Sequence, residues 1–271
     1  MDNTFLEDSP ILNTPAKLNP YKEARWLFVN RFKWDLRPVA WASRKKLRKL
    51  QDKYAGKKAV IMCNGPSLNK VDYDKLKNVF TFGLNKINLL FNRTDFRPSA
   101  IAVVNGHVME QNAAFYNETD IPLFLDTCGL KYVRFRENVH FMHATDTAKF
   151  SRDISGSIWK GGTVTFAAMQ LAYHMGFTKV ALVGCDHYFN AVGAANQLAV
   201  SNGKDDSHFD PNYFSGGMKW QLPDIAASEY SYSLAREMYT ASDRLLLNAT
   251  EGGHLTLLPR IDLDTFLDDK F

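Results

Sequence analysis

The stretch from Lys204 to Gly217, KDDSHFDPNYFSGG, places one histidine among acids and aromatic residues in a polar loop. An unperturbed imidazole has a pKa of about 6.5, so His208 could be neutral in the cell and take a proton from a hydroxyl group. A neighbouring carboxylate would orient the ring and raise its basicity, and the candidates are Asp205, Asp206 and Asp210. The alternative is a loop histidine that packs with Phe209 and Tyr213. Both interpretations stay open.

Asparagine and glycine recur directly after the apolar runs that predict β-strands. These segments are NGPS (64–67), LN (84–85), VNG (104–106), GCDHY (184–188) and NATEGG (248–253). In an open parallel sheet, ligands bind outside the carboxyl ends of the strands. An amide offers donors and an acceptor without charge, which suits ribose hydroxyls, base edges and phosphate oxygens. The pattern favours a nucleotide pocket; the alternative is that Asn and Gly simply form turns.

Two glycine-containing segments have features suited to phosphate. In NGPS, Gly65 would let the backbone approach a ligand closely, and Pro66 would begin a turn or helix. The segment GGT (161–163) opens a helix directly, so its free N–H groups and the helix dipole could hold an anion. NGPS is neither a GxGxxG fingerprint nor a Walker A loop, so each signal is weak on its own.

The order of the predicted elements indicates an α/β fold. Strands are predicted within 57–65, 79–86, 99–106, 121–127, 138–144, 179–189 and 244–250. Helices are predicted at 72–79, 163–174, 224–242 and 262–267, with Gly176 ending the second of them. Strands that alternate with helices predict a doubly wound, mostly parallel, Rossmann-like sheet. We expect an N-terminal arm with basic helices over residues 1–55 and a nucleotide-sugar-binding catalytic domain over 56–271.

The segment between Tyr21 and Leu50 is strongly basic. It holds ten Lys/Arg against two acids, a net charge of +8, although the whole chain carries only +4. It also contains five large aromatic residues: Trp26, Phe28, Phe32, Trp34 and Trp41. One interpretation is a solvated helix pair that packs its aromatic residues on the main domain. The other is peripheral contact with an anionic membrane. No nucleic-acid-binding motif accompanies the patch.

The hydropathy, the cysteines and the carboxylates of the chain predict its location in the cell and whether it binds a metal. No window offers the ~18 consecutive apolar residues that a transmembrane helix needs, and the acidic N-terminus lacks the apolar core of a secretion signal. The three cysteines are widely spaced and odd in number, which is typical of a reducing compartment. We expect a cytoplasmic protein, peripheral at the inner membrane face if the second interpretation of the basic segment holds. The acids around the candidate site, Asp186, Asp205, Asp206 and Asp210, form no DxD-like motif, so we expect no bound metal.

The motifs together resemble a known group of enzymes. AVIMCNGPSLNKVDYDKL is similar to the opening of the Campylobacter-type bacterial sialyltransferases, which use CMP-activated nonulosonic acids. VGCDHYF and KDDSHF resemble that family's G-x-D-x-Y strand end and its histidine loop. The same elements mark a broader group that includes motility-associated flagellin glycosylation factors and an archaeal 6-hydroxymethylpterin diphosphokinase, or MptE-like, branch. The chain resembles this broader group most.

The resemblance implies roles for individual residues. The donor nucleotide would be bound by Asn64, Gly65, Pro66, Ser67, Asn85, Asn105, Gly161, Gly162, Thr163, Gly184, Asp186 and Thr250. His208 would be the general base, and Tyr188 would donate a hydrogen bond to the departing phosphate. A second phosphate-binding tyrosine of the sialyltransferases is replaced by Ala194, with Tyr213 as a possible substitute. The arginine expected before the Gly-rich helix start is missing, and Lys160 is the nearest cation.

The resemblance also implies the activity. We expect a metal-independent, sialyltransferase-like glycosyltransferase without a cofactor, which moves an acidic sugar from a CMP-type donor to a glycan or protein hydroxyl in surface-polysaccharide or flagellin glycosylation. One alternative is pyrophosphate transfer from ATP to a hydroxymethylpterin, which would need Mg²⁺. The other is a non-catalytic nucleotide-binding protein of the same pathway. A homo-oligomer stays open.

Overall fold

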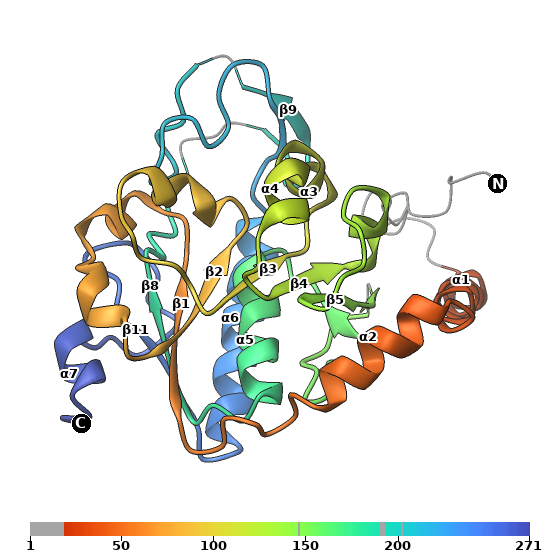
Figure 1. Ribbon diagram of the computed structural model, residues 1–271, viewed down its shortest axis with the longest axis horizontal. Helices are drawn as coiled ribbons and strands as arrows, with labels where there is room; N and C mark the ends of the chain where they lie inside the picture. The colour runs from red at the N-terminus through yellow and green to blue at the C-terminus, as the bar shows by residue number, and fades with distance from the viewer. Residues whose placement is uncertain (1–18, 146, 190–192, 202) are drawn as a thin grey trace.

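A seven-stranded parallel sheet forms the centre of the molecule (Figure 1). The computed structural model describes residues 19–145, 147–189, 193–201 and 203–271. The strand order across the sheet is β11-β8-β1-β2-β3-β4-β5. The strands are β1 (Lys58–Met62), β2 (Phe80–Leu84), β3 (Ala100–Val103), β4 (Leu123–Asp126), β5 (Val139–Met142), β8 (Lys179–Val183) and β11 (Leu245–Asn248). The seven predicted strands and the Rossmann-like class are confirmed.

The apolar runs form strands because both faces of the sheet are covered. In β1, Ile61 lies opposite Phe82 of β2 and Leu182 of β8. Ala59 and Ile61 belong to the core on one face, while Val60 and Met62 belong to the core on the other. A parallel sheet buried on both faces needs continuously apolar strands. The apolar run of β1 could therefore be recognised as a strand from the sequence.

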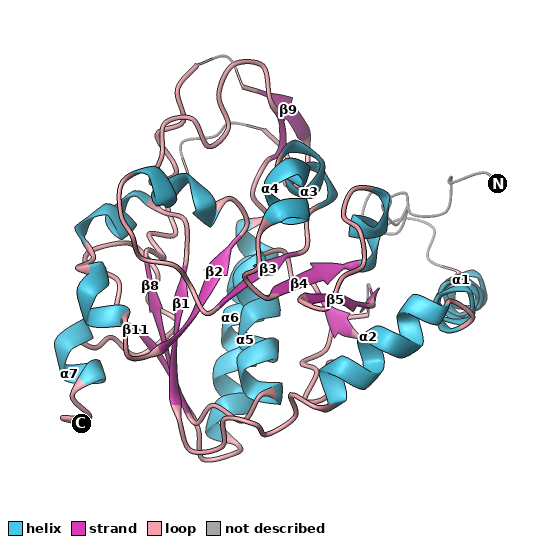
Figure 2. Cartoon of the chain, viewed as in Figure 1, coloured by secondary structure: helices cyan, strands magenta, loops and turns pink. Residues whose placement is uncertain are grey.

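Two long helices cover one face of the sheet, as the secondary-structure view shows (Figure 2). They are α5 (Val164–His174) and α6 (Ile225–Thr240). Gly176 follows α5 with a φ of +91°, the left-handed conformation that commonly ends a helix. Both predicted helices and the glycine stop are therefore confirmed.

Short helices cover the opposite face. The α-helices there are α3 (Gly106–Gln111), α4 (Ala113–Glu118) and α7 (Leu263–Leu267). The 3₁₀ helices are η3 (Pro66–Lys70), η4 (Tyr73–Leu76), η5 (Ile87–Asn92) and η6 (Thr127–Lys131). The helix predicted at 72–79 is shorter than expected, and α3 and α4 were not predicted. Six-residue helices offer too little periodicity to stand out in a sequence.

The basic N-terminal segment forms two helices, α1 (Pro20–Asp35) and α2 (Pro38–Arg48). Helix α2 packs against the edge strand β5, and its Leu47 is buried in the core. Packing of the aromatic residues on the main domain is confirmed for Trp34, which is 7% exposed. It is wrong for Phe28, Phe32 and Trp41, which are 70%, 54% and 66% exposed. None of the described helices is both long and apolar enough to cross a membrane. Residues 1–18 of the predicted arm lie outside the described residues.

Two small sheets lie beside the main one and were not predicted. Strands β9 (Leu198–Val200) and β10 (Lys219–Gln221) form an antiparallel pair, and the loop that carries His208 connects them. Strands β6 (Ala144–Thr145) and β7 (Ile158–Trp159) form a two-residue parallel pair before α5. Strands of two or three residues are too short to contain the apolar runs that predicted the other seven strands.

Candidate active site

The sheet changes direction at β1. From β1 the chain builds outward through β2, β3, β4 and β5 on one side, and it later returns to add β8 and β11 on the other side. The connections that follow β1 and β8 pass to opposite faces of the sheet, which creates a crevice at its carboxyl edge. A cavity of about 1510 Å³ lies there. Typical small-molecule sites occupy roughly 300–1,000 Å³, so this cavity has room for two substrates.

Most of the predicted site residues line this cavity. They are Asn64, Gly65, Asn85, Asn105, Gly161, Gly162, Thr163, Gly184, Asp186, Tyr188 and His208. The structure thus brings together loops that are distant in the sequence. Four predicted residues are not part of the lining: Pro66, Ser67, Tyr213 and Thr250.

The two glycines at the switch point let the loops after β1 and β8 touch. The Gly65 N–H donates a hydrogen bond to the Gly184 carbonyl oxygen at 2.8 Å. A Cβ on Gly65 would lie 2.0 Å from Asp186 Oδ2. Gly184 has a φ of +67°, and a Cβ there would lie 2.6 Å from the Cys63 carbonyl oxygen. Close approach was the predicted reason for Gly65, but the atoms that approach it belong to the protein itself.

Asp186 fixes the NGPS loop. Its Oδ2 accepts a hydrogen bond from Ser67 Oγ at 2.7 Å and another from the Ser67 N–H at 3.2 Å. The Ser67 hydroxyl is therefore engaged by the protein, and its predicted contact with the nucleotide stays a prediction. Thr250 has a similar supporting position, because its buried Oγ1 accepts a hydrogen bond from the Cys185 N–H at 3.0 Å. Both residues hold a loop of the cavity and do not line it.

Two asparagines present unsatisfied acceptors. Oδ1 of Asn64 and Oδ1 of Asn85 are buried and have no hydrogen-bond partner among the described residues. Leaving such a group unpaired costs about 1–3 kcal/mol, so a ligand donor would be stabilising at either position. Asn85 also has a φ of +48°, a conformation that asparagine tolerates better than most residues. Both asparagines are among the residues that line the cavity.

Tyr213 is a structural residue of the loop and not a cavity residue. It is fully buried, and its hydroxyl accepts a hydrogen bond from Asn64 Nδ2 at 3.0 Å. Burial raises the pKa of this hydroxyl far above its usual value. The suggestion that Tyr213 assists the leaving group is therefore not supported by its position.

His208 forms a hydrogen-bonded pair with Asp205. The Nδ1···Oδ2 distance is 2.8 Å, and the two side chains are 13% and 7% exposed. A carboxylate only accepts hydrogen bonds, so Nδ1 carries the proton and Nε2 of the neutral ring is left as the acceptor. Burial alone would raise the pKa of Asp205, but hydrogen bonds from His208 and two backbone N–H groups outweigh it and hold the pKa below its usual value.

Of the three carboxylates that could orient the histidine, the structure selects Asp205. Asp206 lies near the Ser207 hydroxyl, and Asp210 forms an ion pair with Arg93 at 3.2 Å. The packing interpretation also holds in part, because the imidazole stacks on the Tyr213 ring at 4.1 Å between centroids. The ring is thus held by a stack and a carboxylate while it still lines the cavity.

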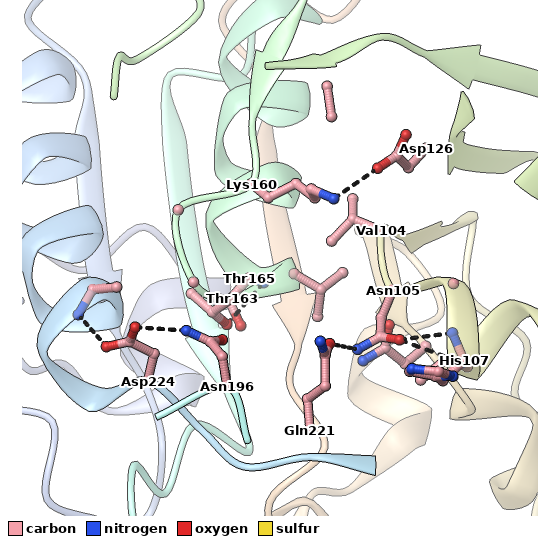
Figure 3. Close-up of a pocket in the computed structure, with 18 of the residues that line it drawn as sticks. Val104, Asn105, His107, Asp126, Lys160, Thr163, Thr165, Asn196, Gln221 and Asp224 are labelled. Atoms are coloured by element: carbon pink, nitrogen blue, oxygen red, sulfur yellow. Dashed lines mark hydrogen bonds and ion pairs between the residues drawn. The ribbon is translucent and has the colours of Figure 1, made fainter. Parts of the chain in front are cut away.

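Asn105 is engaged within the protein. It caps α3, and its Oδ1 accepts hydrogen bonds from the N–H groups of His107 at 2.9 Å and Val108 at 3.4 Å (Figure 3). Its Nδ2 donates to Gln221 Oε1 of β10 at 3.1 Å, which ties the sheet edge to the β9–β10 hairpin. Asparagine is a favoured N-cap residue, so the signal for this role was present in the sequence.

The start of α5 faces the cavity. Gly161 and Gly162 have φ values of +62° and +76°, and Thr163 is the N-cap, whose side chain accepts from the Thr165 N–H at 3.3 Å. The N–H groups of Thr163, Thr165 and Phe166 are already bonded within this turn, so the feature that favours an anion here is the positive end of the helix dipole. Beside them, Lys160 Nζ forms an ion pair with Asp126 Oδ2 at 3.2 Å (Figure 3).

Tyr188 and the β9–β10 hairpin contribute the exposed part of the lining. Tyr188 is 59% exposed, and its ring lies 5.5 Å from that of His254. Asn196 enters the cavity just before β9, and its Nδ2 donates to Asp224 Oδ2 at 2.9 Å (Figure 3). Asn196 and Gln221 were not predicted as site residues, because nothing in the sequence marked the hairpin.

Helix α1 forms another part of the cavity wall, which the sequence did not indicate. The lining residues of this segment are Trp26, Leu27, Asn30, Arg31, Lys33, Trp34 and Arg37. The charged lining of the whole cavity comprises five cations, Arg31, Lys33, Arg37, Lys131 and Lys160, and three acids, Asp126, Asp186 and Asp224. Each of the acids has a partner within the protein. Arg31 and Lys160 are paired as well, with Asp35 and Asp126. Five cations against three acids leave the lining with a net charge of +2, which favours an anionic ligand.

The described residues contain no group of three or more His, Cys, Asp or Glu side chains placed to hold a metal ion. The cavity carboxylates are instead engaged by Lys160, Ser67 and Asn196.

Comparisons with known proteins identify a matching family and a similar solved structure. The model of the family described as 6-hydroxymethylpterin diphosphokinase MptE-like matches residues 39–191, more than half of the chain. No curated protein matches the chain. Among solved structures, a MAf glycosyltransferase from Magnetospirillum magneticum AMB-1 is 16% identical with a TM-score of 0.49. The match covers 83% of this chain and 39% of that protein, so the chain spans about two fifths of its length.

Proposed function

The chain belongs to the 6-hydroxymethylpterin diphosphokinase MptE-like family, and we propose that it is a glycosyltransferase that moves a sugar from a nucleotide donor to a hydroxyl group. The observation that carries the proposal is the His208–Asp205 pair beside the switch-point cavity. Its Nε2 is the acceptor of the neutral ring and is positioned by a buried carboxylate. Transfer to a hydroxyl needs a base of this kind at the rim of a donor site.

In the proposed reaction, His208 Nε2 takes the proton of the acceptor hydroxyl as that oxygen attacks the anomeric carbon of the donor sugar. The new C–O bond forms while the bond to the nucleotide phosphate breaks, and the phosphate leaves with the bonding electrons. Asp205 stabilises the imidazolium that results. Attack from the side opposite the leaving group would invert the anomeric configuration.

The donor would lie along the carboxyl edge of the sheet. The free Oδ1 atoms of Asn64 and Asn85 would accept hydrogen bonds from hydroxyl or amino groups of the nucleotide or sugar. The start of α5 at Thr163 would hold a phosphate or a sugar carboxylate. Tyr188 would donate a hydrogen bond to the departing phosphate. The cationic lining supports an acidic sugar, and the resemblance to the sialyltransferases supports a CMP-type donor.

Thermal-shift measurements test the donor class. Ligands that bind the native state raise the unfolding midpoint, so CMP, CDP, UDP and ATP can be ranked with and without Mg²⁺. We expect CMP to give the largest shift without metal. A shift with ATP alone, and only with Mg²⁺, would contradict the CMP-type donor.

Substitution of the base tests the reaction. We expect His208→Ala to lower kcat about 10²–10⁴-fold, because general base catalysis contributes that much, while donor affinity stays within twofold to threefold. Asn212→Ala is the matched control, since it removes an exposed side chain of the same loop that does not line the cavity. Unchanged turnover in His208→Ala would remove the base assignment.

A second candidate comes from the description of the family. In a diphosphokinase, His208 would deprotonate the hydroxymethyl group of a pterin, and the β-phosphorus of ATP would be attacked with release of AMP. Mg²⁺ would have to arrive with ATP, because the cavity acids are engaged by the protein. Formation of AMP from MgATP only when hydroxymethylpterin is present would favour this candidate. Nucleotide binding without either transfer would instead favour a non-catalytic role.

A further inference from the structure

Helices α1 and α2 carry an exposed apolar surface at the edge of the molecule beyond β5 (Figure 1). We propose that this surface docks the protein on an anionic membrane. The surface, called here the N-terminal face, consists of Tyr21, Phe28, Phe32, Leu36 and Trp41, which are 85%, 70%, 54%, 64% and 66% exposed. Five large apolar side chains with this exposure within one helix pair require a partner.

The spacing of the apolar residues places their side chains on the same side of α1. Phe28, Phe32 and Leu36 follow each other at intervals of four residues, so they share one side of α1. Trp41 joins them from α2, because its Nε1 donates a hydrogen bond to the Asp35 carbonyl oxygen at 2.5 Å. The aromatic rings of Phe28 and Phe32 are stacked at 6.1 Å between centroids. We call the row of Phe28, Phe32 and Leu36 on this side of α1 the apolar ridge.

The opposite side of α1 lines the cavity. Asn30 and Trp34 are among its lining residues, and each is two positions from Phe32 in the chain, about 160° around the helix axis at 3.6 residues per turn. The same helix therefore has the cavity on one side and the N-terminal face on the other. A membrane bound to this face would lie one helix away from the cavity.

Exposed cations surround the apolar ridge. Lys22 and Arg25 lie on α1, and Lys45, Arg48 and Lys49 lie on α2. The α2 cations line a shallow groove together with Trp41. Aromatic residues at the level of the headgroups with Lys and Arg around them are typical of helices that lie in a membrane interface. The cations attract acidic headgroups, so the expected lipid is anionic.

The charge also argues against a second copy of the chain as the occupant. Residues 21–50 carry a net charge of +8. A symmetric dimer through this face would bring two such segments together, and like charges repel. A bilayer with acidic headgroups removes the repulsion and covers the apolar ridge in one step.

The inference extends the proposed function and rests on it in one respect, the identity of the acceptor. The cations Arg31, Lys33 and Arg37 line the cavity wall that α1 provides. If the protein is a glycosyltransferase, these cations would face a phosphate-bearing acceptor anchored in the same membrane. The expected acceptor class is therefore a lipid-linked saccharide with a phosphate group.

Vesicle sedimentation with the full chain tests the docking. We expect binding to vesicles of phosphatidylcholine mixed with phosphatidylglycerol and little binding to phosphatidylcholine alone, with the binding weakened by added NaCl. Phe28→Ser with Phe32→Ser should weaken binding about tenfold or more, because two apolar side chains no longer insert. The matched control is Val200→Ser with Tyr230→Ser, which removes exposed side chains elsewhere and should leave binding unchanged.

A second variant keeps the test valid if the serine variant misfolds. Lys45→Glu with Arg48→Glu changes only exposed side chains of α2 and should also weaken binding about tenfold or more. Absence of sedimentation with the anionic vesicles, or equal binding by both variants and the wild type, would overturn the proposal. Two further outcomes would also overturn it. One is a wild-type dimer in size-exclusion chromatography that becomes a monomer in the Phe28/Phe32 variant. The other is a protein that binds nucleic acid but not the vesicles.

Failure of docking and failure of the proposed function can be told apart. Nucleotide-induced thermal shifts are measured without vesicles, so they report nucleotide binding and not docking. A protein that binds CMP but no vesicle loses only the docking inference, whereas one that binds vesicles but no nucleotide loses the glycosyltransferase proposal and the acceptor class with it.

Discussion

The two sides of the cavity are built in different ways. On the sheet side, the loops after β1 and β8 are joined by backbone hydrogen bonds and by the Asp186–Ser67 contact, with glycines where the chains touch. On the α1 side, Trp34 is the one fully buried residue of the helix. Arg31 adds a hydrogen bond to the Gly156 carbonyl oxygen and an ion pair with Asp35.

This difference matches two kinds of substrate. A nucleotide donor must be held in a fixed geometry for transfer, and closely packed strand ends provide it. Under the docking proposal, the acceptor would arrive from a membrane, and α1 would be the cavity wall that it meets. The sheet side of the cavity would then position the donor for transfer, while the α1 side would locate the protein at the membrane that holds the acceptor.

The first prediction breaks the packed side. Gly184→Ala should lower the free energy of unfolding by about 3–5 kcal/mol, because the new Cβ strains a positive φ and meets the Cys63 carbonyl oxygen and Leu68. Urea unfolding followed by circular dichroism measures the change.

The control for this prediction is Gly216→Ala. Gly216 has a φ of +61°, but a Cβ there would meet no atom within 4 Å. This variant carries only the backbone strain, which costs about 1–2 kcal/mol. Equal losses in the two variants would contradict the view that the loops at the switch point are tightly joined.

The second prediction concerns the pH dependence of the histidine loop. Because the folded-state pKa of Asp205 is lowered, its carboxylate stabilises the fold above the unfolded-state pKa of about 3.9. That contribution is lost as the pH falls through the still lower folded-state pKa. Asp205→Asn should therefore be about 1–3 kcal/mol less stable than the wild type at pH 7, and the gap should narrow below about pH 4.

Urea unfolding of both proteins between pH 7 and pH 3 measures this gap. A gap that stays constant over the range would show that the Asp205 carboxylate has no charge-dependent role. Asp206→Asn is the control, because Asp206 is next in the chain but is not the partner of His208.

The third prediction has the smallest effect and sharpens the contrast with α1. Phe28→Ser should change the free energy of unfolding by less than about 0.5 kcal/mol, because the side chain is 70% exposed and its burial contributes little. A loss of several kcal/mol in urea unfolding would mean that this face is covered within the protein.

Much of the sheet could be predicted because its signals are local. Strands buried on both faces are continuous apolar runs, and α5 ends at a glycine that adopts a positive φ. Asn64 and Asn85 could be placed at one edge because parallel strands end on the same side. The β9–β10 hairpin was not predicted, because its strands are only three residues long and have no buried residue. Asn196 and Gln221 were therefore not recognised as cavity residues.

By itself, the sequence determined the parallel α/β class, the edge of the sheet where polar residues gather, and the histidine loop as a candidate for chemistry. Only the tertiary structure decided that Asp205 orients His208, that Tyr213 and Thr250 support loops, and that α1 forms a wall of the cavity. The physical reason is the range of the interactions. Burial patterns repeat over a few residues, whereas the choice of a hydrogen-bond partner depends on segments that meet only when the chain has folded.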